Sequence, residues 1–351
     1  MRKILFRGIK TCLYLVTALI LIIIYISISQ KCKFKRTVQL DYSRSKKFFM
    51  IQSLNSNEWS LLKTESNPIL NGLIENNLTQ KMPSAIIIGA AKCGTSTLIE
   101  FLGVHPSVAA KSNEIEYFSI NYKKGDEWYR KQMPFSNPYQ ITIEKTPSYF
   151  IEDLSPQRVF KLNPKMKLIL VLRDPVERAV SHYVHTKVNK GNPKVNYFQN
   201  RGLTDQQIFQ KILYVRPGKI QEVYMQNVEI LKHGLYYQHT QNWLKYFPLE
   251  QFLFINGEQL RNDPSVEIDK LQSFLNITPI IKREHFVYNK NKGFFCITNP
   301  SNSTQVKCLN EDKGRKHPVM NSSVLDDLRD YFRSSNENFF KLINQEPWWP
   351  I

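Results

Sequence analysis

The sequence predicts an α/β fold in which a central parallel sheet is flanked by helices. Three observations lead to this expectation. From residue 83 onward, short runs of apolar β-branched residues alternate with helical patterns, which is the order typical of a parallel sheet covered on both faces. The first of these runs leads directly into a glycine-containing loop and then a helix. No internal repeat is evident, so we expect one folded domain.

The predicted elements follow one another as strands and helices of ordinary length. The predicted strands are residues 84–89, 141–144, 167–172 and 252–255. The predicted helices are residues 95–104, residues 175–187, a helical stretch ending at Leu275, and an amphipathic C-terminal helix at 323–342. Pro175 falls in the first turn of its helix, where proline is favoured. Because the carboxyl ends of parallel strands share one edge of the sheet, we expect ligands to bind there.

Residues 11–29 form an uncharged apolar run that predicts a single-pass membrane anchor. A helix of this length crosses roughly 30 Å of hydrocarbon, and no small-residue cleavage pattern follows it. Basic residues flank the run on both sides, so charge alone does not decide the orientation. We expect a cytosolic tail at 1–10, a polar stem at 30–82 and a lumenal domain at 83–351, which is a type II arrangement.

Glycosylation sequons and cysteines support the lumenal orientation. The acceptor positions of the four sequons are Asn77, Asn276, Asn302 and Asn321. Cys296 and Cys308 enclose eleven residues rich in Asn, Ser and Thr. They predict a disulfide hairpin if the domain is lumenal, and two unrelated thiols otherwise.

The chain is strongly basic, with 48 Lys and Arg against 30 Asp and Glu and a formal net charge of +18. This balance indicates a polyanionic partner, which can be a nucleic acid, an anionic membrane or a sulfated polysaccharide. A lumenal protein does not meet nucleic acid, so we expect none as a partner. Basic residues near Trp128 and Tyr129, Lys123 among them, suit a sulfated glycan, which needs ion pairs and sugar stacking.

Residues 86–97, IIIGAAKCGTST, predict a strand, an anion-binding loop and the start of a helix. An ATP-type P-loop places its lysine directly after the second glycine. Thr95 stands there in this chain, and Lys92 precedes Gly94. This order argues against a P-loop kinase. It resembles the loop with which sulfotransferases bind the phosphosulfate of 3′-phosphoadenosine-5′-phosphosulfate (PAPS).

A second anion site is expected because PAPS also carries a 3′-phosphate. In LRDPVERAVS, residues 172–181, Arg173 ends a predicted strand and Ser181 lies about two turns along the next helix. Arginine can bind one phosphate through two donors, and serine adds a hydroxyl. By itself, RDP is also typical of a helix start capped by Asp174. Its pairing with the first loop favours the phosphate site.

With both sites in place, the chain resembles Golgi heparan sulfate sulfotransferases, and it is closest to the glucosamine 3-O-sulfotransferases. The resemblance covers about residues 83–348. Its motifs include IIIGAAKCGTSTLIEFLGVHP, EIEYF, WYRKQMPFS, ITIEKTPSYF, LRDPVERAVSHY, WLKYFP, KGFFC and the segment CLNEDKGRKHP. It implies the P-loop-like PAPS-dependent sulfotransferase fold, a Golgi membrane location, PAPS as donor, heparan sulfate as acceptor and no required metal.

The resemblance also assigns roles by position. It implies Glu114 as the general base that deprotonates the acceptor, assisted by Lys145, with Lys92 at the leaving phosphosulfate. The implied catalytic set is Glu114, Lys92, Lys145 and His185. The implied donor-binding set is Lys92, Cys93, Gly94, Thr95, Ser96, Thr97, Arg173, Ser181, Phe295, Lys313, Gly314 and Arg315. The implied glycan-binding set is Glu116, Lys123, Lys145, His185 and Lys292, with Cys296–Cys308 bracing the lid over the donor.

Two departures from the family pattern leave the sulfated position open. The 3-O enzymes typically read E-x-H-F-F-D where this chain has residues 114–119, so Glu116 replaces a histidine and Ser119 an aspartate. His185 lies where the N-sulfotransferases carry a functional histidine. We expect 3-O-sulfation, with N-sulfation or another position as the alternative. A heparan-binding protein that kept the fold and lost catalysis is a further alternative.

Overall fold

The computed structural model describes residues 78–188, 202–205, 207, 230–300, 302–309, 317–320 and 322–351. The predicted tail, the predicted anchor and almost all of the predicted stem lie outside these residues. Within the part that is described, no helix is both long and apolar enough to cross a membrane.

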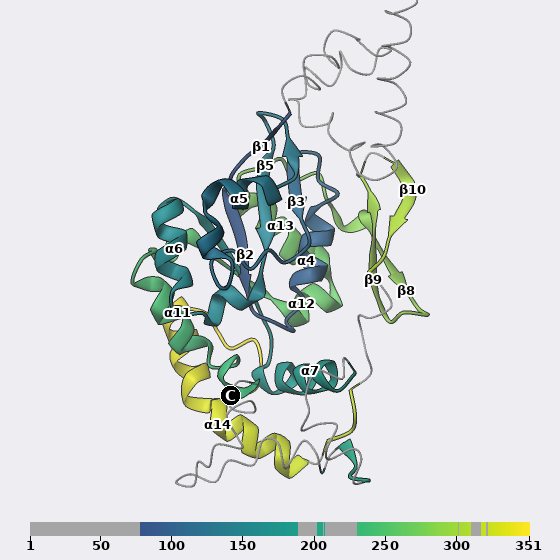
Figure 1. The fold of residues 1–351 in the computed structure, drawn as a ribbon. Coiled ribbons are helices and arrows are strands. Elements are labelled where there is room, and N and C mark those ends of the chain that lie inside the picture. Colours follow the sequence, from purple (N-terminus) through teal and green to yellow (C-terminus); the bar gives the residue numbers. More distant parts are fainter. Residues whose placement is uncertain are drawn as a thin grey trace, which may run out of the picture. The chain divides into compact units, whose positions relative to one another are not determined.

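A five-stranded parallel sheet forms the centre of the fold (Figure 1). Its strand order is β3-β5-β2-β6-β7, and every neighbouring pair is parallel. The strands are β2 (Ala85–Gly89), β3 (Val108–Lys111), β5 (Ile141–Lys145), β6 (Lys167–Leu172) and β7 (Phe252–Asn256). The predicted α/β class with a central parallel sheet is therefore confirmed.

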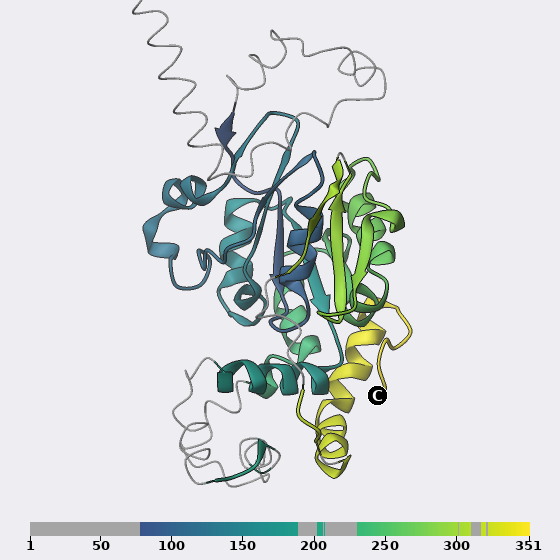
Figure 2. The same ribbon diagram turned by 90° about the vertical axis from the view of Figure 1, so that its right-hand side faces the viewer.

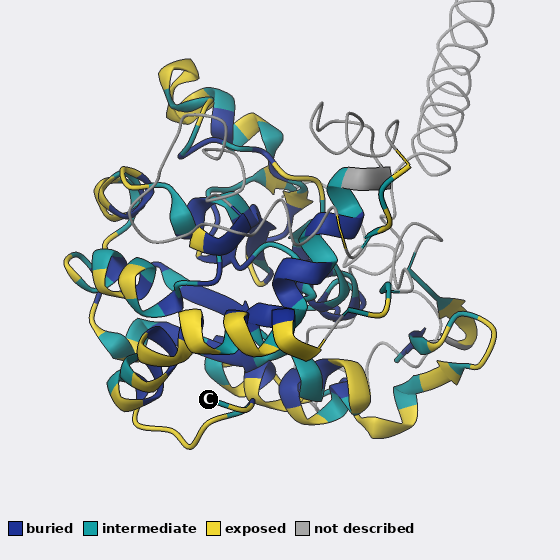
Figure 3. Ribbon diagram, turned by 90° about the horizontal axis from the view of Figure 1, so that it is seen from below, coloured by how far each residue is buried: buried dark blue, intermediate teal, exposed yellow. Residues whose placement is uncertain are grey.

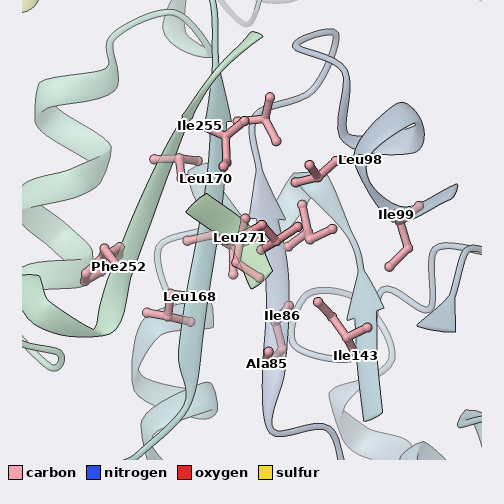
Figure 4. Close-up of a cluster of buried hydrophobic side chains, with 14 of the residues drawn as sticks. Ala85, Ile86, Leu98, Ile99, Ile143, Leu168, Leu170, Phe252, Ile255 and Leu271 are labelled. Atoms are coloured by element: carbon pink, nitrogen blue, oxygen red, sulfur yellow. The ribbon is translucent and has the colours of Figure 1, made fainter. Parts of the chain in front are cut away.

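The two central strands are apolar along almost their whole length. All residues of β2 are buried, as are all residues of β6 after Lys167. Continuous burial shows that both faces of the sheet are covered, which is usual for parallel sheets. Figure 4 shows Ile86 and Leu168 from these strands among the buried side chains of the core, together with Leu98 from helix α4 (Thr95–Leu102).

Helices and short 3₁₀ turns follow the strands and supply the covering layers. Helix α4 contacts β2, β3 and β5, and the C-terminal helix α14 (Ser322–Ile343) packs against α7 (Pro175–Val188) and α11 (Tyr236–Leu244). Exposed residues of α14 alternate with buried ones, as Figure 3 shows for the surface helices in general. The remaining elements are η2 (Tyr122–Lys124), α5 (Asp126–Gln132), η3 (Pro147–Ile151), α6 (Ser155–Leu162), η5 (Leu249–Gln251), α12 (Gly257–Asn262), α13 (Pro264–Leu275) and η6 (Arg283–His285).

A second, antiparallel sheet stands beside the first and faces the viewer in Figure 2. Its strands are β8 (Phe286–Asn289), β9 (Phe294–Asn299) and β10 (Asn302–Lys307). A disulfide joins Cys296 on β9 to Cys308 directly after β10, with an S–S distance of 2.03 Å. The predicted disulfide is confirmed, and the interpretation as two unrelated thiols is wrong.

Some element boundaries differ from the predicted ones. Helix α4 ends at Leu102 because Gly103 caps it, so the predicted end at residue 104 is two residues too late. The short strand β1 (Thr79–Gln80) pairs with β4 (Phe135–Ser136) although it falls in the predicted stem. Strand β3 was not expected, because its sequence Val-Ala-Ala-Lys contains one β-branched residue only.

Candidate active site

A cavity of about 1060 Å³ lies at the carboxyl ends of four neighbouring strands of the parallel sheet. Its lining includes residues within two positions of the ends of β2, β5, β6 and β7. Ligands of open parallel sheets bind at this edge. Several residues predicted for the site from distant parts of the sequence line this one cavity: Lys92, Cys93, Gly94, Thr95, Ser96, Thr97, Glu114, Arg173, Ser181, His185, Lys292 and Phe295.

The loop after β2 has the backbone of an anion site. Gly94 caps α4 with φ 108°, a left-handed conformation that favours glycine, and it has no side chain that could cap the helix. The first helical hydrogen bond joins the Leu98 amide to the Gly94 carbonyl at 3.0 Å. The amides of the first helical turn therefore face the cavity end of α4, where an anion is favoured.

Cys93 lies in this loop but uses its polar groups within the protein. Its amide donates to the Ala90 carbonyl at 3.2 Å, and its thiol lies 3.6 Å from the Tyr236 hydroxyl. Burial raises the pKa of the Cys93 thiol. Cys93 thus stabilises the loop conformation through these contacts, and its thiol stays neutral.

Close packing brings the second predicted anion site next to the first. A Cβ on Gly257 would lie 2.7 Å from the Cys93 carbonyl oxygen and 2.8 Å from that of Leu172. Real Cβ atoms do not tolerate such distances to backbone, so glycine is required where the loops after β2, β6 and β7 meet. The Arg173 region and the loop around Lys92 consequently share one cavity wall.

Arg173 is held between two carboxylates at this wall. Its Nη2 lies 3.6 Å from Glu177 and its Nε 3.5 Å from Glu258, and its side chain is 16% exposed. Burial raises the pKa of Glu258. Both distances are long for ion pairs, so the guanidinium retains donors for an anion in the cavity. Sequence reasoning missed Glu258, which follows Arg173 by 85 positions.

Glu114, which lines the cavity, forms an ion pair with Lys145, which is not among the lining residues. The Lys145 Nζ donates to Glu114 Oε1 at 2.7 Å. The lysine side chain is 4% exposed and the glutamate 46% exposed. A carboxylate that is oriented by a buried ammonium and still open to solvent can accept a proton from a bound molecule.

Glu116 has a different environment from Glu114. Its backbone is left-handed, with φ 54°. Its Oε2 accepts hydrogen bonds from the hydroxyls of Ser119 and Ser148, each at 2.5 Å. Ser148 lines the cavity, whereas Glu116 is not among the lining residues of the described structure. The carboxylate predicted to bind glycan is thus engaged by two hydroxyls of the protein.

Four histidines line the cavity: His182, His185, His233 and His317. The sequence assigned a site role to His185, the quoted motifs contain His182 and His317, and His233 belongs to no motif. Arg178, which is fully buried, donates from Nη1 to Nδ1 of His182 at 3.2 Å. Since arginine is only a donor, His182 must carry its proton on Nε2. Burial, followed by the charge of Arg178, lowers the pKa of His182 to about 2 and that of His233 to about 3. His182 and His233 are therefore neutral imidazoles at the cavity wall.

The remaining predicted residues fall into three groups. Lys292 lines the cavity and donates to the Leu309 carbonyl at 3.2 Å, and Phe295 packs edge-on against Tyr288. Lys123 is exposed on η2 and does not line the cavity. Asn276 is exposed at the end of α13. The positions outside the described residues are Lys313, Gly314, Arg315, Asn77 and Asn321; the side chain of Asn302 is also not described.

The part of the chain that is described contains no cluster of three or more His, Cys, Asp or Glu residues that could hold a metal ion. The cavity instead combines a helix N-terminus, lysines and arginines with two ion-paired carboxylates, Glu114 and Glu258. This donor set suits an anionic ligand with several phosphate- or sulfate-like groups.

Known proteins match this sequence and fold. The family model for the sulfotransferase domain matches residues 82–346. Heparan sulfate glucosamine 3-O-sulfotransferase 5 of Mus musculus and that of Homo sapiens are each 38% identical over 277 residues, covering 78% of this chain and 76% of each relative. Heparan sulfate glucosamine 3-O-sulfotransferase 6 of Mus musculus is 37% identical over 272 residues, covering 77% of this chain and 74% of the relative. The crystal structure of a sulfotransferase from Alicyclobacillus acidocaldarius superposes with a TM-score of 0.56 at 20% identity, covering 76% of this chain and 97% of that one.

Proposed function

This chain belongs to the sulfotransferase family, and from that premise we propose that it transfers a sulfuryl group from PAPS to the 3-hydroxyl of glucosamine residues in heparan sulfate. The relatives that match over three quarters of the chain carry that activity in their names. The observation that supports it most directly is the Lys145–Glu114 ion pair at 2.7 Å beside the phosphate-binding loop. A base and an anion loop in one cavity are what in-line transfer of this kind needs.

The cavity fits PAPS through two separate anion sites. PAPS, when bound, supplies the sulfuryl group and two phosphates. The amides at the start of α4 and Lys92 would hold the phosphosulfate, because helix N-termini and ammonium groups stabilise negative charge. Arg173 and Ser181, both in the cavity wall, would hold the 3′-phosphate. Phe295 would contact the adenine. Lys313, Gly314 and Arg315, which follow the disulfide, would close over the donor.

Glu114 would act as the general base. Its partner Lys145 holds the carboxylate in place through the ion pair, and Glu114 itself lines the cavity. Lys92 would offset the charge that develops on the leaving phosphate as the sulfuryl group departs. No step of this transfer uses a metal ion.

The acceptor position is the finer part of the proposal. Similarity to 3-O-sulfotransferases favours the 3-hydroxyl. His185, which lines the cavity, keeps N-sulfation as the second candidate. Lys123 and Lys292 would bind glycan sulfates outside the reacting groups. Retained glycan binding without any transfer would instead indicate a heparan-binding protein of the same fold.

We also propose a type II Golgi membrane protein with a lumenal catalytic domain. The uncharged run at 11–29 supports the anchor. The Cys296–Cys308 disulfide supports an oxidising compartment, and exposed Asn276 is available for glycosylation. Immunolocalisation with a Golgi marker and a shift on enzymatic deglycosylation would test this. A cytosolic distribution would contradict it.

The decisive experiment measures the product. The full-length chain in detergent is incubated with sulfate-labelled PAPS and defined heparan oligosaccharides, and the sulfated position is mapped by mass spectrometry. We expect label at the 3-hydroxyl of glucosamine and none with the Glu114→Gln variant. Label on the amine would identify an N-sulfotransferase. Binding of ATP without binding of 3′-phosphoadenosine 5′-phosphate would contradict the sulfotransferase assignment altogether.

A further inference from the structure

Glu144 is a carboxyl group buried beneath the candidate active site. It lies on β5 between β2 and β3, and its exposed fraction is 0%. Successive side chains of a strand point to opposite faces. Lys145 therefore reaches Glu114 at the cavity, while its neighbour Glu144 points away from that pair and into the protein.

Hydroxyl donors surround the Glu144 carboxylate. Tyr129 donates to Oε1 at 2.9 Å and Thr146 donates to Oε2 at 2.9 Å. Tyr149 also hydrogen bonds to it. An ionised carboxylate can only accept hydrogen bonds. The ionised form of Glu144 therefore suits the hydroxyl donors around it.

These same donors hold the loop that carries Glu114. The Ile115 amide donates to the Thr146 hydroxyl at 3.1 Å, and the Tyr117 amide donates to the Tyr149 hydroxyl at 2.7 Å. The Tyr117 ring also stacks on the Tyr129 ring, with centroids 4.3 Å apart and planes within 10°. Each group that touches Glu144 is thus in contact with one of the residues that follow Glu114.

We propose that Glu144 is a positioning residue for sulfuryl transfer: by fixing the Thr146, Tyr129 and Tyr149 hydroxyls, its carboxylate holds the loop that carries Glu114 in the orientation in which Glu114 meets Lys145. The proposal rests on the proposed function, because it concerns the base of that reaction. Glu144 touches neither substrate. Its effect reaches the reacting atoms through the backbone at Ile115 and Tyr117.

The charge state of Glu144 links this network to pH. Burial raises the pKa of Glu144 to about 7; the hydroxyl hydrogen bonds oppose this rise, and the charge of Glu116 adds to it. The titratable groups around it are Tyr129 from α5, Tyr149 from η3 and Glu116 from the loop, with Lys111 opposite it on β3. Protonation replaces an acceptor with a donor, so one hydroxyl loses its partner. Transfer should therefore increase as the pH rises through about 7.

The first test compares Glu144→Gln with wild type in the full-length chain. The amide keeps the size of the side chain but offers one acceptor oxygen instead of two. We expect kcat to fall about 10- to 100-fold, as for misplaced catalytic groups. The Kd for 3′-phosphoadenosine 5′-phosphate by calorimetry should stay unchanged. Glu250→Gln, which alters an exposed glutamate, is the matched control and should behave as wild type.

The second test uses Thr146, which links Glu144 to the loop. Thr146→Ser keeps the hydroxyl and should keep most activity, whereas Thr146→Val should lose about as much as Glu144→Gln. The double variant should be no worse than either single one, because the groups act as a unit. If Glu144→Gln does not fold, comparing Thr146→Ser with Thr146→Val still tests the positioning role.

The pH profile distinguishes positioning from a general loss of structure. Wild-type kcat should rise through about pH 7, and Glu144→Gln should lose that rise. A Glu144→Gln kcat within twofold of wild type, or fully additive Thr146→Val and Glu144→Gln losses, would overturn the positioning role while leaving the proposed function intact. A wild-type chain that transfers no sulfate would overturn the proposed function, and the positioning role with it.

Discussion

Lys145 and Glu114 share a 2.7 Å ion pair in which one partner is buried and the other is open. The lysine comes from the end of the buried strand β5, and an unpaired ammonium there would be costly. Glu114 compensates that charge while 46% of its side chain stays exposed. The pair therefore fixes a carboxylate at the cavity and leaves it accessible to an acceptor hydroxyl.

Glu114→Gln should abolish transfer while the donor still binds. The amide cannot take a proton, and loss of a general base costs about 10²- to 10⁴-fold in rate. Single-turnover transfer of labelled sulfate measures the rate, and calorimetry with 3′-phosphoadenosine 5′-phosphate measures binding. Near-normal turnover would show that another group is the base.

Arg173→Ala should weaken donor binding more than it slows chemistry. Charged hydrogen bonds contribute about 1.5–3 kcal/mol, which corresponds to about a 10- to 150-fold rise in Kd for 3′-phosphoadenosine 5′-phosphate. Lys92→Ala should instead lower kcat strongly, since its charge matters most as the sulfuryl group leaves. Arg283→Ala, at a side chain that is 84% exposed, is the control. If Arg173→Ala raised the Kd of an analogue without the 3′-phosphate by the same factor, Arg173 would not be the ligand of the 3′-phosphate.

The sequence was sufficient for the elements whose local pattern is unambiguous. Strand β6 has the predicted bounds because KLILVL is a continuous apolar run between polar residues. Strand β3 and the sheet of β8, β9 and β10 were missed, because Val-Ala-Ala-Lys and the segments around Phe294 have neither strong alternation nor a long apolar run. Their pairing depends on partners elsewhere in the chain.

The same limit explains which site residues were found. Lys92, Arg173 and Glu114 belong to short motifs, and the fold places all three in the lining of one cavity. Glu258 and His233 belong to no motif. They meet the site through tertiary packing, as in the hydrogen bond from the Asp174 amide to Glu258 across 84 positions. No local pattern carries that information.

The disulfide should stabilise the wall that carries Phe295. Replacing Cys296 and Cys308 with serine opens a loop of sequence separation 12 and should cost about 2–3 kcal/mol. It should also raise the KM for PAPS, because Phe295 lies beside Cys296 and lines the cavity. Dithiothreitol should lower the Tm of wild type and leave that of the double variant unchanged. If dithiothreitol lowered the Tm of wild type and of the double variant equally, the effect would come from a cysteine other than Cys296 and Cys308.

Acid should destabilise the protein through His182 and His233. Burial lowers their pKa values to about 2 and about 3, below the ordinary 6.5. The unfolded chain therefore binds protons that the native chain does not, and the unfolding free energy falls as the pH drops below 6.5. Two such histidines should cost about 1–2 kcal/mol between pH 6.5 and 5.5. Urea unfolding at each pH measures this, and a His182→Gln/His233→Gln variant should show a flatter dependence. An unchanged slope in that variant would assign the acid sensitivity to other groups.

Glu116 allows the sharpest comparison between the role expected from the sequence and the environment in the structure. Its carboxylate accepts hydrogen bonds from Ser119 and Ser148 at 2.5 Å each, so it fastens the loop after Glu114 to the start of η3. Glu116→Gln should then lower kcat about 3- to 10-fold, within the range of one ordinary hydrogen bond of about 0.5–1.5 kcal/mol because the amide keeps one acceptor oxygen, with little change in the KM for glycan. Ser148→Ala should do the same, and the double variant should be no worse.

The alternative, that Glu116 contacts the glycan, predicts the opposite pattern. Heparan sulfate is a polyanion, so removing a carboxylate from its binding site would reduce repulsion and lower the KM at low salt. Initial rates for Glu116→Gln at two salt concentrations separate the two cases. A lowered, salt-dependent KM with unchanged kcat would contradict the structural role of Glu116. A lowered kcat that Ser148→Ala reproduces would establish that role, because Ser148 reaches the loop through the Glu116 carboxylate.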